Sequence, residues 1–215
     1  MSNFRFPAWT NKIKHVAGAA GAGALVYAVV AVNYGFSPSA TDVGYQPVQP
    51  VPFSHQLHSG QLGTDCRYCH NTVEVASHSP VPTTETCMGC HSMIHTKSEK
   101  LEPIRASWET GEAVPWVRIH DLPDYSYFNH SAHVNRGVGC KSCHGRIDTM
   151  EVVYQDQKLS MGWCLECHRE PENHLRPQDR ITDMDWAPEN QVELGLQIKE
   201  ARNINPPQSC SGCHR

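Results

Sequence analysis

The sequence has little from which a conventional apolar core could be built. Only 39% of the 215 residues are hydrophobic, and much of that share lies in one run near the N-terminus. Patterns typical of regular strands are scarce, and glycine and proline, with 15 residues each, interrupt the chain often. We therefore expect an irregular fold of short helices that depends on more than side-chain packing for its stability.

A surplus of positive charge is also absent. Lys and Arg number 18 against 22 Asp and Glu, which gives a formal net charge of −4. Domains that bind nucleic acid usually carry a basic patch drawn from a surplus of Lys and Arg. The charge balance therefore argues against nucleic acid as a partner.

No cysteine lies outside one repeated motif. All ten cysteines fall in five Cys-x-x-Cys-His motifs, which in chain order are Cys66/Cys69/His70, Cys87/Cys90/His91, Cys140/Cys143/His144, Cys164/Cys167/His168 and Cys210/Cys213/His214. In such a motif the two thiols attach haem c covalently, and the histidine is the proximal ligand of its iron. With 14 histidines in 215 residues, the chance that all five pairs are followed by His is roughly one in a million. The sequence therefore predicts five covalent haems c.

Three other uses of paired cysteines fit less well. Two pairs close a tetrahedral zinc site, so five pairs leave one unmatched, and zinc does not need a histidine after each pair. A thioredoxin-like redox site would supply one pair beside a βαβ pattern, which the sequence lacks. A disulfide framework is compatible with export, but it gives no reason for the fifth residue of each motif.

The one long apolar run is close to the length needed to cross a bilayer. Residues 16–32 contain no charge, and the run continues to Phe36 after Asn33. Arg5, Lys12 and Lys14 precede it, with no acidic residue among the first forty, so the positive-inside rule places the N-terminus in the cytoplasm. We predict a cytoplasmic N-terminus at 1–15, a transmembrane helix at 16–36 and an extended linker at 37–52. The remainder would lie on the periplasmic side of a bacterial inner membrane.

The same run has two further interpretations. A cleaved signal peptide has the same order of charges, but we expect a retained single-pass anchor. Residues 17–24 are all Ala or Gly, and spacings such as that of Ala17 and Gly21 allow close approach between membrane helices. This favours a protein partner in the membrane, the alternative being that small residues are merely tolerated there.

An internal repeat organises the rest of the chain. The pattern Phe-x-His-x-x-His occurs at residues 53–58 and again at 128–133, and each copy is followed by two attachment motifs. We predict a first two-haem module at 53–115, a second at 116–179, and a C-terminal segment at 180–215 with the fifth haem. Leu101, Ile104 and Trp108 have helical spacing and predict a helix between the modules, and residues 192–201 predict another.

The histidines outside the motifs are candidates for the sixth, distal iron ligand that an electron-transfer haem needs. Histidines at i and i+3 lie on one face of a helical turn and can serve two neighbouring irons. The strongest candidates are therefore His55, His58, His130 and His133. The fifth ligand is left open between His120 and Met161, of which Met161 would raise the potential of its haem. His78, His95 and His174 are better explained as loop histidines.

These motifs resemble the pentahaem cytochrome subunit of bacterial alternative complex III, a quinol:electron-acceptor oxidoreductase. The similarity covers residues 51–215 and is most specific in VPFSHQLHSGQLGTDCRYCH, in the run from Trp116 to Gly145 and in LSMGWCLECHR. The Phe-x-His-x-x-His elements alone also resemble small multihaem cytochromes of the c3 and c7 kind. The resemblance implies a quinol-binding polytopic subunit and an iron–sulfur subunit as partners, and a monohaem cytochrome c or terminal oxidase as acceptor.

Three classes of function follow. The leading expectation is an electron-transfer subunit of such a membrane complex, and the second is a stand-alone, membrane-anchored quinol dehydrogenase that feeds periplasmic reductases. A multihaem enzyme that reduces a small molecule is the third, but it needs an open iron, which one family marks with Lys in place of the motif histidine. All five motifs here end in His, and at least five candidate distal ligands are present.

Overall fold

The computed structural model describes residues 6–214, and its contacts divide the chain into one compact part up to Asp42 and a second from Val43 onward. Residues 1–5 of the predicted cytoplasmic N-terminus, including Arg5, lie outside the described residues, as does Arg215. The described chain is helical and contains no strand, only an isolated antiparallel bridge between Val138 and Leu175. The predicted fold class is therefore confirmed.

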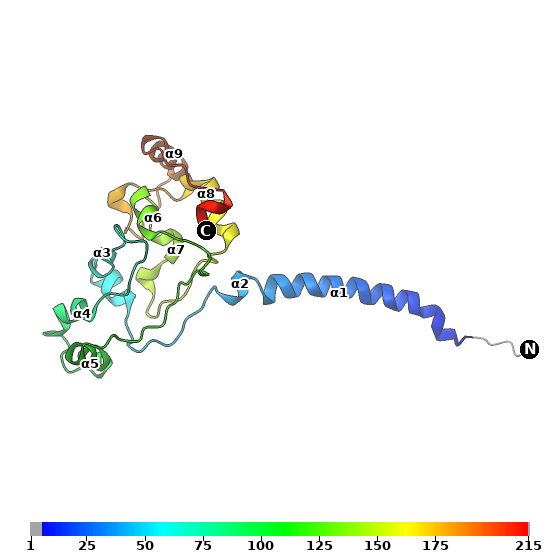
Figure 1. The fold of residues 1–215 in the computed structure, drawn as a ribbon, viewed down its shortest axis with the longest axis horizontal. Helices are drawn as coiled ribbons and strands as arrows, with labels where there is room; N and C mark the ends of the chain where they lie inside the picture. Colours follow the sequence, from blue (N-terminus) through cyan, green and yellow to red (C-terminus); the bar gives the residue numbers. More distant parts are fainter. Residues whose placement is uncertain (1–5, 215) are drawn as a thin grey trace, which may run out of the picture. The chain divides into compact units, whose positions relative to one another are not determined.

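The N-terminal part is dominated by one long apolar helix. The 3-10 helix η1 (Ala8–Lys12) runs into α1 (Ile13–Gly35), and the short α2 (Pro38–Thr41) follows within the stretch predicted as an extended linker. The span Ala8–Gly35 has 28 residues and a mean hydropathy of 1.8. Figure 1 shows it as one continuous helix. By length and composition it can cross a membrane, and its residues are nearly all exposed.

The second part consists of short helices joined by long irregular segments (Figure 1). The α-helices are α3 (Cys66–Cys69), α4 (Thr84–His91), α5 (Glu102–Thr110), α6 (His130–Arg136), α7 (Lys141–His144), α8 (Met161–Arg169), α9 (Gln191–Ala201) and α10 (Cys210–Cys213). Five further single turns lie between them: η2 (Gln56–Gln61), η3 (Glu99–Leu101), η4 (Ile147–Thr149), η5 (Pro171–Asn173) and η6 (Gln178–Arg180). Of these, η2 is a π-helical turn that begins inside the first Phe-x-His-x-x-His element and extends three residues beyond it.

Local capping explains where several of these helices begin and end. The Asn129 side chain accepts the Ala132 backbone N–H at the start of α6, and Ser160 accepts that of Trp163 at the start of α8. Helix α6 ends at Gly137 and α5 at Gly111, both in the left-handed conformation that glycine adopts without strain. The second Phe-x-His-x-x-His element therefore continues into a helix with defined ends.

The apolar core of this part is small and joins segments that are far apart in the sequence. Val73, Val134 and Ile181 form one buried cluster, against which Cys140 packs. Most other buried apolar residues, such as Leu175 with 1% of its surface exposed, lie in the C-terminal half. A core of this size leaves much of the folding free energy to other groups.

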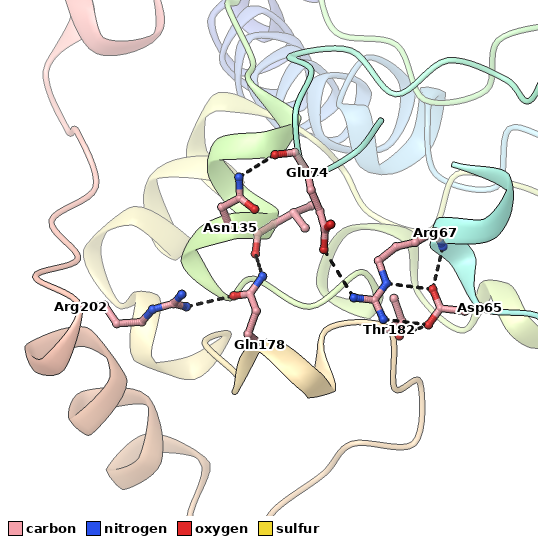
Figure 2. Close-up of polar contacts among 8 residues, drawn as sticks. Asp65, Arg67, Glu74, Asn135, Gln178, Thr182 and Arg202 are labelled. Carbon is pink, nitrogen blue, oxygen red and sulfur yellow. Dashed lines mark hydrogen bonds and ion pairs between the residues drawn. The ribbon is translucent and has the colours of Figure 1, made fainter. Parts of the chain in front are cut away.

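A polar network holds the same segments together (Figure 2). Asn135 of α6 donates to the Glu74 backbone carbonyl at 2.7 Å, and Gln178 donates to the carbonyl of Val134 at 3.3 Å. Arg202 in turn donates to the Gln178 side chain at 3.1 Å. Residues of the first module, of α6 and of the C-terminal segment are thus tied together around α6.

Candidate haem-attachment sites and their histidines

Each of the five Cys-x-x-Cys-His motifs contains a helical turn, in α3, α4, α7, α8 and α10. The spacing i, i+3 puts both sulfur atoms of a motif on one face of the turn. In the first, third and fifth motifs the backbone N–H of the histidine donates to the backbone carbonyl of the first cysteine, at 2.9, 3.0 and 2.8 Å. The two thiols and the imidazole of a motif are therefore presented together.

All ten cysteines are free thiols, so none is committed to a disulfide. Within residues 6–214, no three or more His, Cys, Asp or Glu side chains are arranged to hold a bare metal ion, whereas structural zinc needs four ligands. The paired thiols are thus available for covalent attachment of a haem.

Most motif histidines are oriented by a backbone carbonyl. The Nδ1 atoms of four of them lie within hydrogen-bonding distance of carbonyl oxygens: His70 at 3.4 Å from Pro80, His91 at 3.0 Å from Ile94, His168 at 2.6 Å from Pro207, and His214 at 3.0 Å from Tyr125. Since a carbonyl only accepts, Nδ1 must carry the proton, which leaves the Nε2 lone pair free. This tautomer and orientation are those of a histidine that binds a metal through Nε2.

The two Phe-x-His-x-x-His elements have the same local geometry. In the first, His58 Nδ1 donates to the Ser54 carbonyl at 2.8 Å, and in the second, His133 Nδ1 donates to that of Asn129 at 2.8 Å. Phe53 stacks on His58 with ring centres 4.4 Å apart and planes at 23°, and Phe128 stacks on His133 at 4.5 Å and 25°. The sequence repeat is thus also a structural repeat.

Three candidate distal histidines face motif histidines at a common separation. The ring centres of His58 and His91 are 6.2 Å apart, those of His130 and His144 are 6.3 Å apart, and those of His133 and His168 are 6.1 Å apart. Two imidazoles bound to opposite sides of one metal by bonds of about 2 Å have ring centres about 6 Å apart. These pairs therefore fit the second, third and fourth motifs.

His55 is the remaining histidine of the two elements and fits the first motif. Burial lowers the pKa of His55 to about 4, and among charged neighbours His70 of the first motif contributes most. The Nδ1 atoms of His55 and of its counterpart His130 are buried without a hydrogen-bond partner within the described chain. By the repeat, His55 corresponds to His130, which faces the third motif, so His55 and His70 are the equivalent pair.

The candidates for the remaining ligand lie in different surroundings. His120 is part-buried, and its Nε2 has no hydrogen-bond partner among the described residues. Its ring centre is 4.5 Å from that of His144, which is closer than two ligands of one iron would be. Met161 is the first residue of α8 and is 66% exposed. Neither side chain is brought against the fifth motif by a contact that the structure records. The choice between them stays a prediction.

The three histidines interpreted as loop residues are not paired with a motif histidine. His78 Nε2 lies 3.5 Å from the Arg118 guanidinium. His95 is exposed and has a backbone φ of 55°, in the left-handed region. His174 follows η5, and burial lowers its pKa. None of the three lies in an arrangement like those of the other candidates.

Burial keeps the histidines around the third motif neutral. The pKa of His144 is lowered to about 3, first by burial and then by the charges of His120 and His130. Burial also lowers the pKa of His130 and that of His133. A neutral imidazole is the form that binds iron, so this environment favours ligation over protonation at physiological pH.

The thiols place the first motif next to both the second and the third. Burial raises the pKa of Cys69, and Cys87, Cys66 and Cys90 raise it further because they lie close by. The thiols of Cys66 and Cys140 lie close together, and this proximity raises the pKa of Cys140. The first motif thus lies between the second and the third.

The remaining motifs continue in chain order. Burial raises the pKa of Cys143 to about 12, with smaller contributions from Cys167 and Cys164 of the fourth motif. Burial likewise raises the pKa of Cys164, and its main charged neighbour is Cys213 of the fifth motif. Neighbouring motifs therefore follow the order second, first, third, fourth, fifth.

Two features of this site were not predicted from the sequence. One is the role of the phenylalanine in each element, although its recurrence at the same offset from both histidines was a usable signal. The other is the set of carbonyls that orient the motif histidines, such as those of Pro207 and Tyr125, which lie 39 and 89 residues away. No local pattern marks such distant acceptors.

Comparison with known proteins points to the same broad class of protein. Residues 126–215 match the family described as cytochrome c7 and related cytochrome c. The chain is also similar to the multihaem cytochrome c subunit of a menaquinone reductase from Nitratidesulfovibrio vulgaris (strain Hildenborough), with 28% identity over 168 residues, covering 68% of this chain and 80% of that protein. Residues 126–215 of this chain thus resemble a cytochrome c7-like multihaem domain, which fits the covalent haem c expected at its attachment motifs.

Proposed function

We propose that the chain is the five-haem electron-transfer subunit of a quinol-oxidising membrane complex of the alternative complex III type. The observation that carries this proposal is the common separation of about 6 Å between distal and motif histidines in three pairs. An iron held from both sides has no open position for a small substrate, which favours electron transfer over catalysis. When bound, the haems supply reversible one-electron Fe(III)/Fe(II) chemistry.

The order of the motifs supports a conducting role. Each motif lies close to the next in the order second, first, third, fourth, fifth. We propose that the second and fifth motifs form the two ends, where electrons enter and leave. The residues of the two elements hold neighbouring imidazoles in fixed orientations, which keeps adjacent centres close without a moving part.

The apolar helix supports a membrane location. We propose that Ala8–Gly35 is a single-pass anchor in a bacterial inner membrane, with the second part of the chain on the periplasmic side. A quinol-binding polytopic subunit and an iron–sulfur subunit would be its partners, and a monohaem cytochrome c or a terminal oxidase its acceptor. The relative's description as a subunit of a menaquinone reductase supports membership of a quinone-linked assembly.

That description also favours a second candidate, in which electrons flow the other way. In a menaquinone reductase the cytochrome subunit would take electrons from an external donor and deliver them toward the membrane quinone. The same order of motifs serves both directions. Their distinction lies in the donor that reduces the haems.

Purification from membranes followed by anaerobic reduction tests these proposals. We expect five haems per chain by mass and by haemochrome assay, and a stoichiometric polytopic subunit that stays bound in detergent. Reduction by a menaquinol analogue supports quinol oxidation, whereas reduction by an external cytochrome followed by menaquinol formation supports the reverse direction. A chain recovered alone and still reduced by quinol would instead be a stand-alone dehydrogenase.

The absence of an open iron is tested separately. We expect every haem in the resting protein to be low-spin and slow to bind cyanide, because the proposal assigns two side-chain ligands to each iron. A high-spin signal in the resting EPR spectrum, or rapid cyanide binding, would move the proposal toward a small-molecule reductase.

A further inference from the structure

Arg176 is a buried guanidinium beside the third attachment motif. Only 6% of its surface is exposed, although arginine is rarely buried without a charged partner. Its Nη1 donates to the Asp183 backbone carbonyl at 2.7 Å, and no ion pair to it is present among residues 6–214. The Asp183 carboxylate acts on it only from beyond ion-pair distance. A buried charge without a direct ion pair is costly, so its retention calls for a reason.

The backbone around the third motif is shaped to hold this side chain. The bridge between Val138 and Leu175 aligns the two segments, and the Arg176 N–H donates to the Gly137 carbonyl at 2.8 Å. A Cβ atom at Gly139 would lie 2.3 Å from Arg176 Nε and 2.4 Å from Cζ. The guanidinium therefore lies directly over the residue that precedes Cys140, in a space that only glycine leaves open.

The other end of the guanidinium is fixed to the segment that also holds the motif. The Cys140 N–H donates to the Ile181 carbonyl at 3.1 Å, two residues before the Asp183 carbonyl that accepts from Arg176. Burial lowers the pKa of Arg176, but a guanidinium keeps its proton at any physiological pH. The structure thus fixes one permanent positive charge next to the third motif.

We propose that Arg176 raises the reduction potential of the haem attached at Cys140 and Cys143. This inference rests on the proposed attachment of haem c at that motif. On reduction the iron gains one electron and no proton, so the haem loses one unit of positive charge. A fixed cation nearby disfavours the oxidised form, and burial away from water lets the effect persist.

Redox titration of the full-length, membrane-purified chain tests the proposal. In R176Q we expect one of the five potentials to fall by about 59 mV, which is about a tenfold rise in that haem's oxidised-to-reduced ratio at a fixed ambient potential. In R176K the charge remains, so the oxidised-to-reduced ratio of this haem should stay within about threefold of the wild-type value. This holds even if the loss of the planar guanidinium lowers the melting temperature. If R176Q carries five haems with unchanged potentials, or if R176K shifts the potential as much as R176Q, Arg176 is only a structural clamp.

A matched control comes from the first module. The Arg105 guanidinium also donates through Nη1 to a backbone carbonyl, that of Ser98 at 2.8 Å, but it is only half-buried. R105Q should therefore leave the potential of the third haem unchanged. An equal shift of that potential in R105Q would show that the charge acts without regard to place and would overturn the proposal.

A further variant covers the case in which R176Q does not assemble. Asp183 is partly exposed, and in D183N its backbone carbonyl still accepts from Arg176 while the opposing carboxylate charge is gone. The potential of the same haem should then rise. If it does not rise, the proposal is wrong. Haem content is measured by mass in the wild type and in every variant. A wild-type chain without haem at Cys140 and Cys143 contradicts the proposed function rather than this inference.

Discussion

The two Phe-x-His-x-x-His elements have the same ligand geometry in different surroundings. In both, a phenylalanine stacks on the second histidine, whose Nδ1 donates to a carbonyl four residues earlier. The segment around the second motif, which follows the first element, is open: Trp108, Met93 and Ile94 are all more than half exposed. The second element leads into α6, which carries Val134 of the buried cluster. The repeat thus fixes how the histidines are presented, and later packing fixes the environment of each iron.

The residue before the first cysteine shows the same divergence. Before Cys66 it is Asp65, which caps α3 and binds Arg67 and Thr182. Before Cys140 it is Gly139, over which Arg176 lies. Equivalent positions therefore carry a negative side chain in one module and admit a positive one in the other, which gives the modules a means to differ in potential.

The largest effects are expected where the two elements are most alike. H58A and H133A each remove one imidazole that faces a motif histidine, so each should convert about a fifth of the haem from low-spin to high-spin. EPR spectra of the purified, fully loaded chain measure this fraction. H95N is the matched control, because His95 is exposed and asparagine tolerates its left-handed backbone. A high-spin signal in only one of the two histidine variants would break the equivalence of the elements.

The second prediction compares the buried cluster around α6 with the packing of α5 in the first module. Ile181 and Ile104 are both 3% exposed, so replacing either with alanine should cost about 2–5 kcal/mol of local stability. Ile181 packs in the cluster with Val73 and Val134, so I181A should lower the free energy of unfolding of the whole second part. I104A should speed amide hydrogen exchange mainly in α5 and in α4, which packs against it.

The rate of amide hydrogen exchange in α6 and α7 distinguishes the two variants. I181A should raise this rate, and I104A should leave it near the wild-type value. Equal exchange in α6 and α7 of both variants would mean that the two modules unfold as one and that the openness of the first has no energetic consequence.

The sequence was a good guide where structure depends on local pattern. The predicted apolar span at 16–36 corresponds to α1 (Ile13–Gly35), the spacing of Leu101, Ile104 and Trp108 corresponds to α5 with its preceding turn, and the predicted helix at 192–201 corresponds to α9. The predicted multihaem character also rests on local motifs. In each case, residues within a few turns of one another carry the information.

Features that depend on contacts between distant segments could not be predicted. The proximity of Cys66 to Cys140 joins residues 74 positions apart, and it decides that the first motif lies between the second and the third. Arg176 is unremarkable in sequence, and only the bridge at Val138 and the space over Gly139 give it a place. Such contacts follow from the packing of irregular segments, for which no periodicity exists.

A smaller effect is expected from the stacked phenylalanines. F53L and F128L keep an apolar side chain but remove the flat contact with the imidazole, which should cost about 0.5–1.5 kcal/mol each. Because the ring is then freer to turn, the anisotropy of one low-spin EPR signal should change in each variant while haem content stays complete. Y45L, at an exposed tyrosine outside the attachment motifs, is the control and should change neither the EPR anisotropy nor the haem content. A change in one phenylalanine variant alone would show that the surroundings, not the element, orient the histidine.

The smallest effect is expected at Asp65, where the first module differs from the third motif's glycine. The Arg67 side chain holds the pKa of Asp65 at about 2, against the opposing effect of burial, and the Thr182 hydroxyl also donates to it at 2.9 Å (Figure 2). A carboxyl whose pKa is depressed on folding stabilises the fold above its ordinary pKa near 4, and this contribution disappears as the pH falls through about 2. Both charged side chains are more than 40% exposed, so D65N should lower the free energy of unfolding by less than about 1 kcal/mol at neutral pH.

The difference in the free energy of unfolding between wild type and D65N, measured by denaturant unfolding, should shrink between about pH 4 and pH 2. T182V keeps the pair with Arg67, so much of this pH dependence should remain, and a D65N difference that does not change with pH would show that the carboxylate charge contributes nothing to joining the modules.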